Sequence, residues 1–367
     1  MKTLRDFDFK NKSVICRVGF NVDLVEGKIL DDTRIISTLP TLKYMLDQGA
    51  RKISLVTHLG RPDGTFDSKT ALEPVAKRLA ELLNSNEYYK TEKGYQITDR
   101  VFMYENIRFD SRETSKEVDE RKSLAEELAK GHDLYVNDAF ADCHRQHASL
   151  YELPEILPSC AGFLVQQEFE MLNKLMENPA SPFVCVLGGA KVDTKIGVIK
   201  NLLNKVDRFL VGGKIGNAFL AAKGEDMQKS MPEEAELAIA KEILSIAEEK
   251  IELPDDFNWF NGEVYDVGAK TAERYSSIIQ EAKTVFWNGP LGFIEGDKEY
   301  LAGSNRIAKA MSEASGVTIV SGGETVSVVQ KEDLSDKMTF LSTGGGATLE
   351  FLAGLELPGL KVLGFYQ

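Results

Sequence analysis

Residues 183–191 read FVCVLGGAK, an apolar run that ends in a glycine pair. Such runs of β-branched and aromatic residues favour a strand, and adjacent glycines favour a tight turn after it. Similar runs recur along the chain, and longer segments of helical period lie between them. Strands that alternate with helices predict parallel sheets with helices on both faces. The chain is therefore expected to be α/β throughout.

Nine strands are expected from these runs, each followed by a polar or glycine-rich turn. Segments of helical period separate the strands of the first half, so the expected architecture is two doubly wound, Rossmann-like parallel sheets. The expected strands cover residues 13–18, 52–57, 101–104, 133–137, 183–187, 208–211, 284–287, 317–320 and 339–341, and the expected helices of the first half cover residues 33–46, 71–83 and 115–130.

The length of 367 residues predicts two domains, because a single hydrophobic core usually stops growing at roughly 250 to 300 residues. Residues 162–178 (GFLVQQEFEMLNKLMEN) carry apolar side chains at helical spacing and are followed by Pro179, which ends a helix well. We expect residues 161–178 to form a long helix between a first domain, residues 1–160, and a second domain, residues 179–349.

The composition is that of an ordinary soluble globular protein, with 43% hydrophobic and 28% charged residues. A formal net charge of −13 argues against broad binding of nucleic acid or of anionic membranes, since either needs a basic face. The sequence shows no leader-like apolar run near Met1 and no apolar stretch of about 18 residues, so a cytoplasmic location is expected. The four cysteines form no Cys-x-x-Cys pair and are expected to be buried free thiols.

Histidines and arginines gather where the predicted strands of the first half end. They occur in residues 58–62 (HLGRP), 105–109 (ENIRF) and 137–147 (NDAFADCHRQH), and residues 31–34 (DDTR) add a further arginine beside a helix N-cap signal. Ligands of open parallel sheets bind outside the carboxyl ends of the strands, so these side chains are expected to converge on one crevice. The planar guanidinium group binds carboxylate and phosphate in bidentate fashion, which favours a small polyanion as the ligand. Each side chain taken alone could equally be a surface residue or a helix C-cap.

The second half carries glycine-rich turns in place of these histidines and arginines. Glycines where a strand turns into a helix let backbone amides approach a phosphate closely, and the helix dipole assists. A single glycine pair also occurs for steric reasons alone, but five such turns favour a nucleotide-phosphate site. The five turns lie at residues 187–191, 211–213, 288–290, 321–323 and 342–346.

Motifs of the best-known nucleotide-binding folds are absent from the sequence. The chain contains no G-x-x-x-x-G-K-[ST] of P-loop proteins, no G-x-G-x-x-G of dinucleotide-binding domains, and no H-R-D or D-F-G of protein kinases. A polyanion site in one domain and a nucleotide site in the other predict phosphoryl transfer across a cleft. Such a reaction depends on positioning, charge neutralisation and exclusion of water, and domain closure would provide the last of these.

The sequence resembles the phosphoglycerate kinase family in eight segments that come in the family's order. This resemblance implies reversible phosphoryl transfer between ATP and 3-phosphoglycerate, giving ADP and 1,3-bisphosphoglycerate. It also implies an N-terminal domain that binds phosphoglycerate, a C-terminal domain that binds MgATP or MgADP, hinge bending around the linking helix, and a monomer. Residues 350–367 would return to the N-terminal domain. The segments are residues 17–22 (RVGFNV), 31–34, 54–61 (ending HLGR), 105–109, 136–148 (VNDAFADCHRQHA), 188–199, 287–292 (WNGPLG) and 342–351 (STGGGATLEF), within a match from about residue 10 to residue 363.

The resemblance also assigns roles to individual residues. The acceptor carboxylate is already ionised at neutral pH, so no general base is required. Phosphoglycerate would be bound by Asn21, Arg34, His58, Arg61, Arg108 and Arg145. The transferring phosphoryl group would be stabilised by Arg34, Lys191 and the amides of Gly322, Gly323, Gly345 and Gly346, of which Arg34, Lys191, Gly323 and Gly345 are the expected catalytic groups. The nucleotide would be bound by Gly188, Gly189, Lys191, Lys195, Gly212, Gly213, Gly268, Asn288, Glu295, Gly322, Gly323, Glu324 and Thr325, with Mg²⁺ held through the nucleotide by Glu324.

Four positions depart from the family pattern. Gly19 replaces the aspartate whose carboxylate contacts the hydroxyl of phosphoglycerate, and Glu324 replaces the aspartate that handles nucleotide-bound magnesium. Glutamate keeps the oxygen ligand that Mg²⁺ prefers, on a longer arm. Lys214 stands where the pocket wall is usually glycine, and residues 251–265 are shorter than the family's equivalent, which includes another strand.

These departures leave two alternatives to an active phosphoglycerate kinase. One is an inactive or weak paralogue that binds a nucleotide or a partner protein, motivated by Gly19, Glu324 and the short segment. The other is a kinase for a different small carboxylate, motivated by the carboxylate that is missing at position 19.

Overall fold

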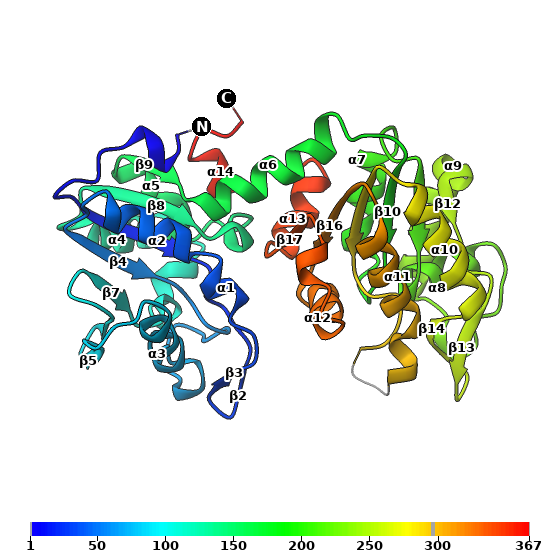
Figure 1. Ribbon diagram of the computed structural model, residues 1–367, viewed down its shortest axis with the longest axis horizontal. Helices are drawn as coiled ribbons and strands as arrows, with labels where there is room; N and C mark the ends of the chain where they lie inside the picture. The colour runs from blue at the N-terminus through cyan, green and yellow to red at the C-terminus, as the bar shows by residue number, and fades with distance from the viewer. Residues whose placement is uncertain (1, 295–297, 367) are drawn as a thin grey trace. The chain divides into compact units, whose positions relative to one another are not determined.

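The computed structural model describes residues 2–294 and 298–366. Tertiary contacts divide the chain into two compact units. The first unit is formed by Met1–Glu170 together with Glu356–Gln367, and the second unit by Met171–Leu355. Each unit contains a mainly parallel sheet with helices packed on it (Figure 1). Among the described residues, none of the helices combines the length and apolar character that a membrane span needs.

The sheet of the first unit has seven strands in the order β5-β6-β7-β4-β1-β8-β9. Neighbouring strands from β7 to β9 pair in parallel, whereas β5 and β6 form an antiparallel edge. Every residue of β1 and β8 is buried, as expected for central parallel strands. The bounds are Tyr89–Thr91 (β5), Gly94–Gln96 (β6), Val101–Tyr104 (β7), Lys52–Val56 (β4), Ser13–Val18 (β1), Leu134–Asp138 (β8) and Ser159–Ala161 (β9).

Short helices cover this sheet. The single helix predicted at residues 33–46 was wrong, because the segment forms two helices, α1 and α2. Pro40 lies in the first turn of α2, and in a continuous helix its ring would clash with the carbonyl four residues earlier. The helices are α1 (Thr33–Ile36), α2 (Leu39–Asp47), α3 (Glu73–Leu82), α4 (Val118–Ala129), α5 (Leu153–Ile156) and α14 (Pro358–Lys361), and α6 (Phe163–Glu177) begins in this unit.

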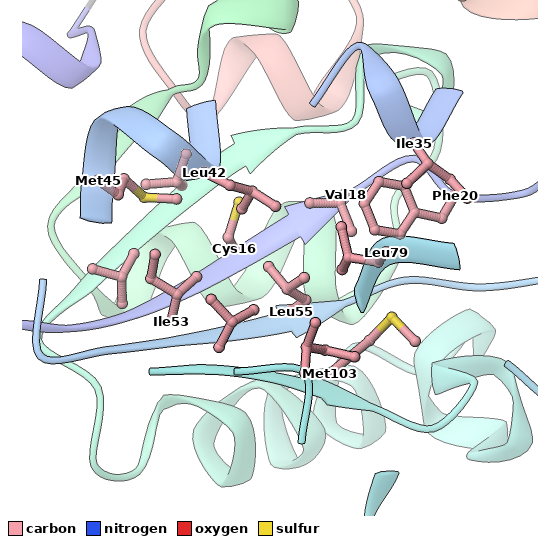
Figure 2. Packing of buried hydrophobic residues seen from close by; sticks show 14 of the residues in the cluster. Cys16, Val18, Phe20, Ile35, Leu42, Met45, Ile53, Leu55, Leu79 and Met103 are labelled. Atoms are coloured by element: carbon pink, nitrogen blue, oxygen red, sulfur yellow. The ribbon is translucent and has the colours of Figure 1, made fainter. Parts of the chain in front are cut away.

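The core of the first unit holds α1 in place. Figure 2 shows Phe20, from the loop after β1, lying against Ile35 of α1, with Val18 and Leu79 close by. Ile35 has no exposed surface, and burial of such a side chain stabilises a fold by about 1.5 to 3 kcal/mol. The neighbouring Arg34 is thereby fixed in position.

The sheet of the second unit has six strands in the order β12-β11-β10-β15-β16-β17, each parallel to its neighbours. Because β10 lies between β11 and β15, the turns after these three strands are adjacent. The strands are β12 (Ile251–Glu252), β11 (Arg208–Val211), β10 (Phe183–Leu187), β15 (Thr284–Asn288), β16 (Val317–Ser321) and β17 (Phe340–Ser342). The helices are α7 (Asp193–Leu202), α8 (Gly213–Ala222), α9 (Glu234–Ala247), α10 (Ala269–Glu281), α11 (Ala302–Glu313), α12 (Gly323–Lys331) and α13 (Gly346–Leu352).

The short segment at residues 251–265 forms the edge of this sheet. β12 has two residues, and the chain then leaves the sheet to form a separate antiparallel hairpin of β13 (Phe257–Phe260) and β14 (Glu263–Val267). The hydroxyl of Tyr275 on α10 lies 2.9 Å from the carbonyl oxygen of Val211 and 2.6 Å from that of Glu252. The edge strand is therefore tied to the helix that packs on it.

The prediction for the cysteines is confirmed. Cys16, Cys143, Cys160 and Cys185 are all buried and free.

Candidate active site

Three basic side chains of the first unit, Arg17, His58 and Arg108, lie near the carboxyl ends of adjacent strands. Arg17 is the second-last residue of β1, and His58 comes two residues after β4. Arg108 belongs to a 3₁₀ turn, Ile107–Phe109, that follows β7. Because β7, β4, β1 and β8 are neighbours in the sheet, these residues meet at one end of it.

Hydrogen bonds join three of the predicted substrate residues into one cluster. Arg34 Nη1 donates to the carbonyl oxygen of Asn21 (3.2 Å), and the amide of Gly60 donates to Asn21 Oδ1 (2.8 Å). Arg108 Nη1 donates to the carbonyl oxygen of Gly60 (2.8 Å). These bonds fix the loops after β1, β4 and β7 with respect to one another and to α1.

A fully buried arginine connects His58 to a carboxylate. Arg17 Nη2 lies 3.0 Å from His58 Nδ1 and 3.1 Å from Asp142 Oδ2. Since a guanidinium group only donates, His58 Nδ1 is the acceptor, and the proton of the neutral imidazole is on Nε2. Burial is the main cause that lowers the pKa of His58 to about 3. The histidine is therefore a neutral hydrogen-bond donor at physiological pH.

A second buried carboxylate supports Arg17. Arg17 Nε donates to Ser149 Oγ (3.0 Å), and this hydroxyl donates to Glu113 Oε1 (2.6 Å). Burial raises the pKa of Glu113, and the charge of Arg17 opposes that rise. No role was predicted from the sequence for Arg17, Glu113, Ser149 or Asp142. The available signal was a charged side chain inside the apolar strand at residues 13–18.

Arg61 and Arg145 are exposed at the margin of the cluster. The amide of Arg145 donates to the carbonyl oxygen of Asp142 (3.0 Å), so one short turn carries both residues. Arg145 also interacts electrostatically with Arg108. Within the described part of the chain, no hydrogen bond or ion pair links the Arg61 side chain to the other residues of the cluster.

The second unit contains a cavity of about 650 Å³. Its walls come from the turns after β10, β11 and β15, from the starts of α8, α9 and α12, and from β14. Tyr265 and Phe293 both line it and pack edge to face with ring centres 5.6 Å apart. A volume of several hundred Å³ with apolar walls and a few polar groups is typical of a small-molecule site.

The glycine turns at this cavity are packed against one another. The amide of Gly189 donates to the carbonyl oxygen of Pro290 (2.8 Å), and the amide of Gly213 donates to that of Leu291 (3.1 Å). A Cβ on Gly188 would lie 2.2 Å from the carbonyl oxygen of Pro290. These glycines therefore shape the cavity by close packing, and their amides are already used by protein carbonyls.

Two other glycine turns begin helices. Gly322 (φ 96°) precedes α12, and Gly345 (φ 51°) precedes α13. Glycine adopts such positive φ angles readily. A Cβ on Gly323 or Gly345 would meet no atom within 4 Å, so both positions border open space. The unpaired amides and the dipole at the start of α12 would attract an anion there.

Three predicted nucleotide residues lie close to the packed turns. The Nζ of Lys195, which is 6% exposed, would be 3.8 Å from a Cβ on Gly189. Burial lowers the pKa of Lys195, and the nearby Glu324 opposes this. Asn288 Nδ2 donates to the carbonyl oxygen of Ser321 (3.0 Å). Thr325 Oγ1 accepts a hydrogen bond from the amide of Gly289 (2.8 Å).

The remaining predicted nucleotide residues of this group are Lys191, Gly212, Gly268 and Glu295. Lys191 is exposed just before α7 and interacts electrostatically with Lys195. Gly212 is the N-cap of α8. Gly268 is the N-cap of α10, where its amide donates to the carbonyl oxygen of Asp256 (2.7 Å), and it is not among the described residues that line the cavity. Glu295 lies outside the described residues.

The carboxylates that line the cavity are Glu233, Glu236, Glu263 and Glu324, and Glu324 lies at the start of α12. In residues 2–294 and 298–366, no group of three or more His, Cys, Asp or Glu side chains could hold a metal by itself. Mg²⁺ is commonly held by one or two carboxylates together with substrate phosphates and water. Glu324 therefore fits an ion that arrives with a nucleotide.

Known proteins resemble this chain over nearly its whole length. The family model described as "Phosphoglycerate kinase" matches residues 4–355. A phosphoglycerate kinase of Dictyoglomus turgidum is 44% identical over 392 aligned positions, which cover 98% of this chain and 97% of that protein. The phosphoglycerate kinase of Chloroflexus aggregans is 43% identical over 399 positions, which cover 99% and 98%.

Solved structures agree with these sequence matches. The phosphoglycerate kinase of Coxiella burnetii is 36% identical with a TM-score of 0.83, and that of Pyrococcus horikoshii OT3 is 33% identical with a TM-score of 0.88. Each comparison covers 99% of this chain and 98% of the other.

Proposed function

The chain belongs to the phosphoglycerate kinase family, and we propose that its first unit binds 3-phosphoglycerate while its second unit binds ATP or ADP with Mg²⁺. The family identity makes the chain a glycolytic phosphotransferase with a carboxyl group as acceptor. The relatives compared give no support to the inactive paralogue that the sequence left open.

The observation that carries the assignment of the first unit is the hydrogen-bonded cluster of Asn21, Arg34 and Arg108 beside His58. 3-Phosphoglycerate has a carboxylate at one end and a phosphate at the other, and guanidinium groups bind both. We assign Arg61 and Arg145 to the same ligand from their exposed positions.

The chemistry suits these residues because the acceptor oxygen needs no deprotonation. The carboxylate of 3-phosphoglycerate is ionised at neutral pH, and His58, with a pKa of about 3, is a weak base. His58 would instead donate from Nε2 to an anionic oxygen of the ligand. Catalysis then rests on alignment of the two reactants and on stabilisation of the charge on the transferring group.

Groups from both units would stabilise the charge of the transferring phosphoryl group. Arg34 would stabilise the phosphoryl oxygens from the acceptor side, and Lys191 with the amides of Gly323 and Gly345 would do so from the nucleotide side. Lys195 and Asn288 would hold nucleotide phosphates. Mg²⁺ bound through those phosphates and Glu324 would supply further neutralisation of their negative charge.

Three finer predictions from the sequence are kept as proposals. They are hinge bending when both ligands are bound, a monomeric enzyme, and a cytoplasmic location. Hinge bending is supported by the need of phosphoryl transfer for direct contact between the reactants and for exclusion of water.

A coupled turnover assay tests the proposed function. Wild type, Arg34→Ala and Arg5→Ala are compared at saturating MgATP and varied 3-phosphoglycerate. Arg5 is an exposed arginine of the same unit and serves as the matched control. We expect turnover by wild type and Arg5→Ala, and a loss of about 10³-fold or more in Arg34→Ala. Wild-type protein that binds ADP but shows no turnover above a blank would contradict the proposal.

A further inference from the structure

One buried carboxylate lies among the positive charges of the first unit. Asp142 ends a 3₁₀ turn, Phe140–Asp142, that follows β8, and it is 7% exposed. Its Oδ2 is 3.1 Å from Arg17 Nη2 and 3.6 Å from His58 Nδ1. Burial alone would raise the pKa of Asp142, but its positive surroundings, including Arg17 and Arg108, hold that pKa below its ordinary value. Asp142 is therefore ionised at physiological pH.

A negative charge at this place disfavours binding of a polyanion. The position of Asp142 among the substrate residues therefore requires an explanation. The oxygen of Asp142 that pairs with Arg17 and His58 is Oδ2. Among the described residues, none forms a hydrogen bond with Oδ1. Oδ1 is also absent from the set of fully buried polar atoms without a partner, so it keeps some exposure to solvent. Oδ1 is thus an acceptor that is open to solvent beside the substrate cluster.

The chemistry of 3-phosphoglycerate identifies what such an acceptor would meet. At neutral pH the carboxylate and the phosphate of this ligand are chiefly acceptors. The hydroxyl on its second carbon is the neutral group that donates. An ionised carboxylate in the site would repel both ends of the ligand and attract that hydroxyl.

We propose that Asp142 accepts the hydrogen bond of the substrate hydroxyl, and that it thereby makes up for the side chain that Gly19 lacks. This inference rests on the proposed function. Asp142 and Arg145 share one turn, so the same turn would hold the hydroxyl and one anionic end of the ligand. In this arrangement the enzyme selects hydroxy acids over acids without a hydroxyl.

The simpler alternative is that Asp142 only balances the charge of Arg17. The two roles predict different responses to the substrate. A counter-ion role would affect every acceptor alike, whereas a bond to the hydroxyl would affect only acceptors that have one.

The test compares 3-phosphoglycerate with 3-phosphonooxypropanoate, which lacks the hydroxyl, as acceptors for wild type, Asp142→Asn and Asp142→Ala. Wild type should prefer 3-phosphoglycerate in kcat/KM. We expect Asp142→Ala to lower kcat/KM about tenfold to a hundredfold more for 3-phosphoglycerate than for the acid without the hydroxyl. Asp142→Asn keeps the shape of the side chain and one carbonyl oxygen. Its preference for 3-phosphoglycerate should therefore lie between that of wild type and that of Asp142→Ala. Equal losses for both acceptors would overturn the proposal.

Rescue from position 19 gives an independent readout. A Cβ on Gly19 would lie 3.6 Å from Ala139 Cα, which is ordinary contact, so the backbone at this position accepts a side chain. Gly19→Asp in the Asp142→Ala background should restore most of the preference for 3-phosphoglycerate. A double variant that folds and turns over but still fails to distinguish the two acids would count against Asp142 as the partner of the hydroxyl.

Two controls separate the possible failures. Asp133 lies at the other end of β8, where its Oδ2 accepts from the amide of Ser13 (2.8 Å), and Asp133→Ala should leave the preference unchanged. Circular dichroism melts report whether the first unit of each variant, which contains the changed residues, is folded. Wild type without turnover on either acid would refute the proposed function, whereas wild type that turns over both acids equally well would refute only the role of Asp142.

Discussion

Replacing Asp266 with asparagine should change how the stability of the second unit depends on pH. Asp266 has no exposed surface, and its carboxylate accepts the amides of Gly303 (2.7 Å) and Val267 (2.8 Å). Burial nevertheless raises the pKa of this group from 3.8 to about 7. The folded chain therefore holds the proton more tightly than the unfolded chain does.

The sign and size of the effect follow from this difference. The contribution of Asp266 to stability is fully present below pH 3.8 and is lost as the pH rises to about 7. Each tenfold change in acidity is worth about 1.4 kcal/mol, so the free energy of unfolding should fall by about 2 to 3 kcal/mol between pH 5 and pH 8 through Asp266 alone. Asparagine does not ionise, so Asp266→Asn should lack this fall. At pH 5 the variant should be less stable by about 1 kcal/mol, because its amide group accepts through one oxygen only.

Urea denaturation at several pH values between 5 and 8 measures this effect. Both tryptophans, Trp259 and Trp287, belong to the second unit, so their fluorescence reports on that unit. Asp138 in the first unit has a pKa that burial also raises to about 7, and Asp138→Asn is the matched control whose effect should appear in circular dichroism but not in fluorescence. Parallel fluorescence-detected stability profiles for wild type and Asp266→Asn would refute the reasoning.

Three further changes test other parts of the structure. Gly188→Ala would force a 2.2 Å contact with the carbonyl oxygen of Pro290, so we expect a loss of about 1 to 3 kcal/mol in fluorescence-detected stability together with weaker ADP binding; unchanged values of both would show that the turns can separate freely. Arg121→Ala would leave buried Glu152 without the guanidinium partner that is now 2.6 Å away. The free energy of unfolding of the first unit should therefore fall by about 3 to 5 kcal/mol, as measured in circular dichroism melts. A fall of less than about 1 kcal/mol would mean that water reaches Glu152. Lys214 lines the cavity, so Lys214→Ala should weaken ADP binding severalfold at low salt and less at high salt. Titration calorimetry measures this effect, and an ADP affinity that is independent of salt in both wild type and variant would mean that the Lys214 side chain points to solvent.

The α/β fold was predictable because its strands are continuous apolar runs. The strand predicted at residues 183–187 is β10, and that predicted at residues 101–104 is β7. Four of the missed strands, β5, β6, β9 and β12, have two or three residues each and carry no periodic pattern of their own. The hairpin of β13 and β14 had a usable signal in Asn261-Gly262, since both residues adopt positive φ and this pair is typical of a tight hairpin turn.

The candidate site was only partly predictable, for a physical reason. Strand ends reveal which side chains reach a crevice, so His58 and Arg108 could be proposed from local sequence, and a helix N-cap signal pointed to Arg34. Asn21 came only from the family resemblance. The network of Arg17, Asp142 and His58 depends on contacts between residues 41 and more positions apart, and no local pattern encodes it. The resemblance to a family added the roles of individual residues. It did not indicate a role for Asp142, because that role was inferred from the distances of this carboxylate to Arg17 and His58.

The tethered edge of the second sheet also bears on association between copies of the chain. An open edge strand offers unpaired amides and carbonyls to any extended segment of another molecule. β12 offers two residues, the hydroxyl of Tyr275 lies by the carbonyl of Glu252, and Arg274 binds the carbonyl of the next residue, Leu253. An incoming strand would have to displace these groups and would gain few hydrogen bonds in return. The sheet thus ends at β12 in an edge that resists aggregation.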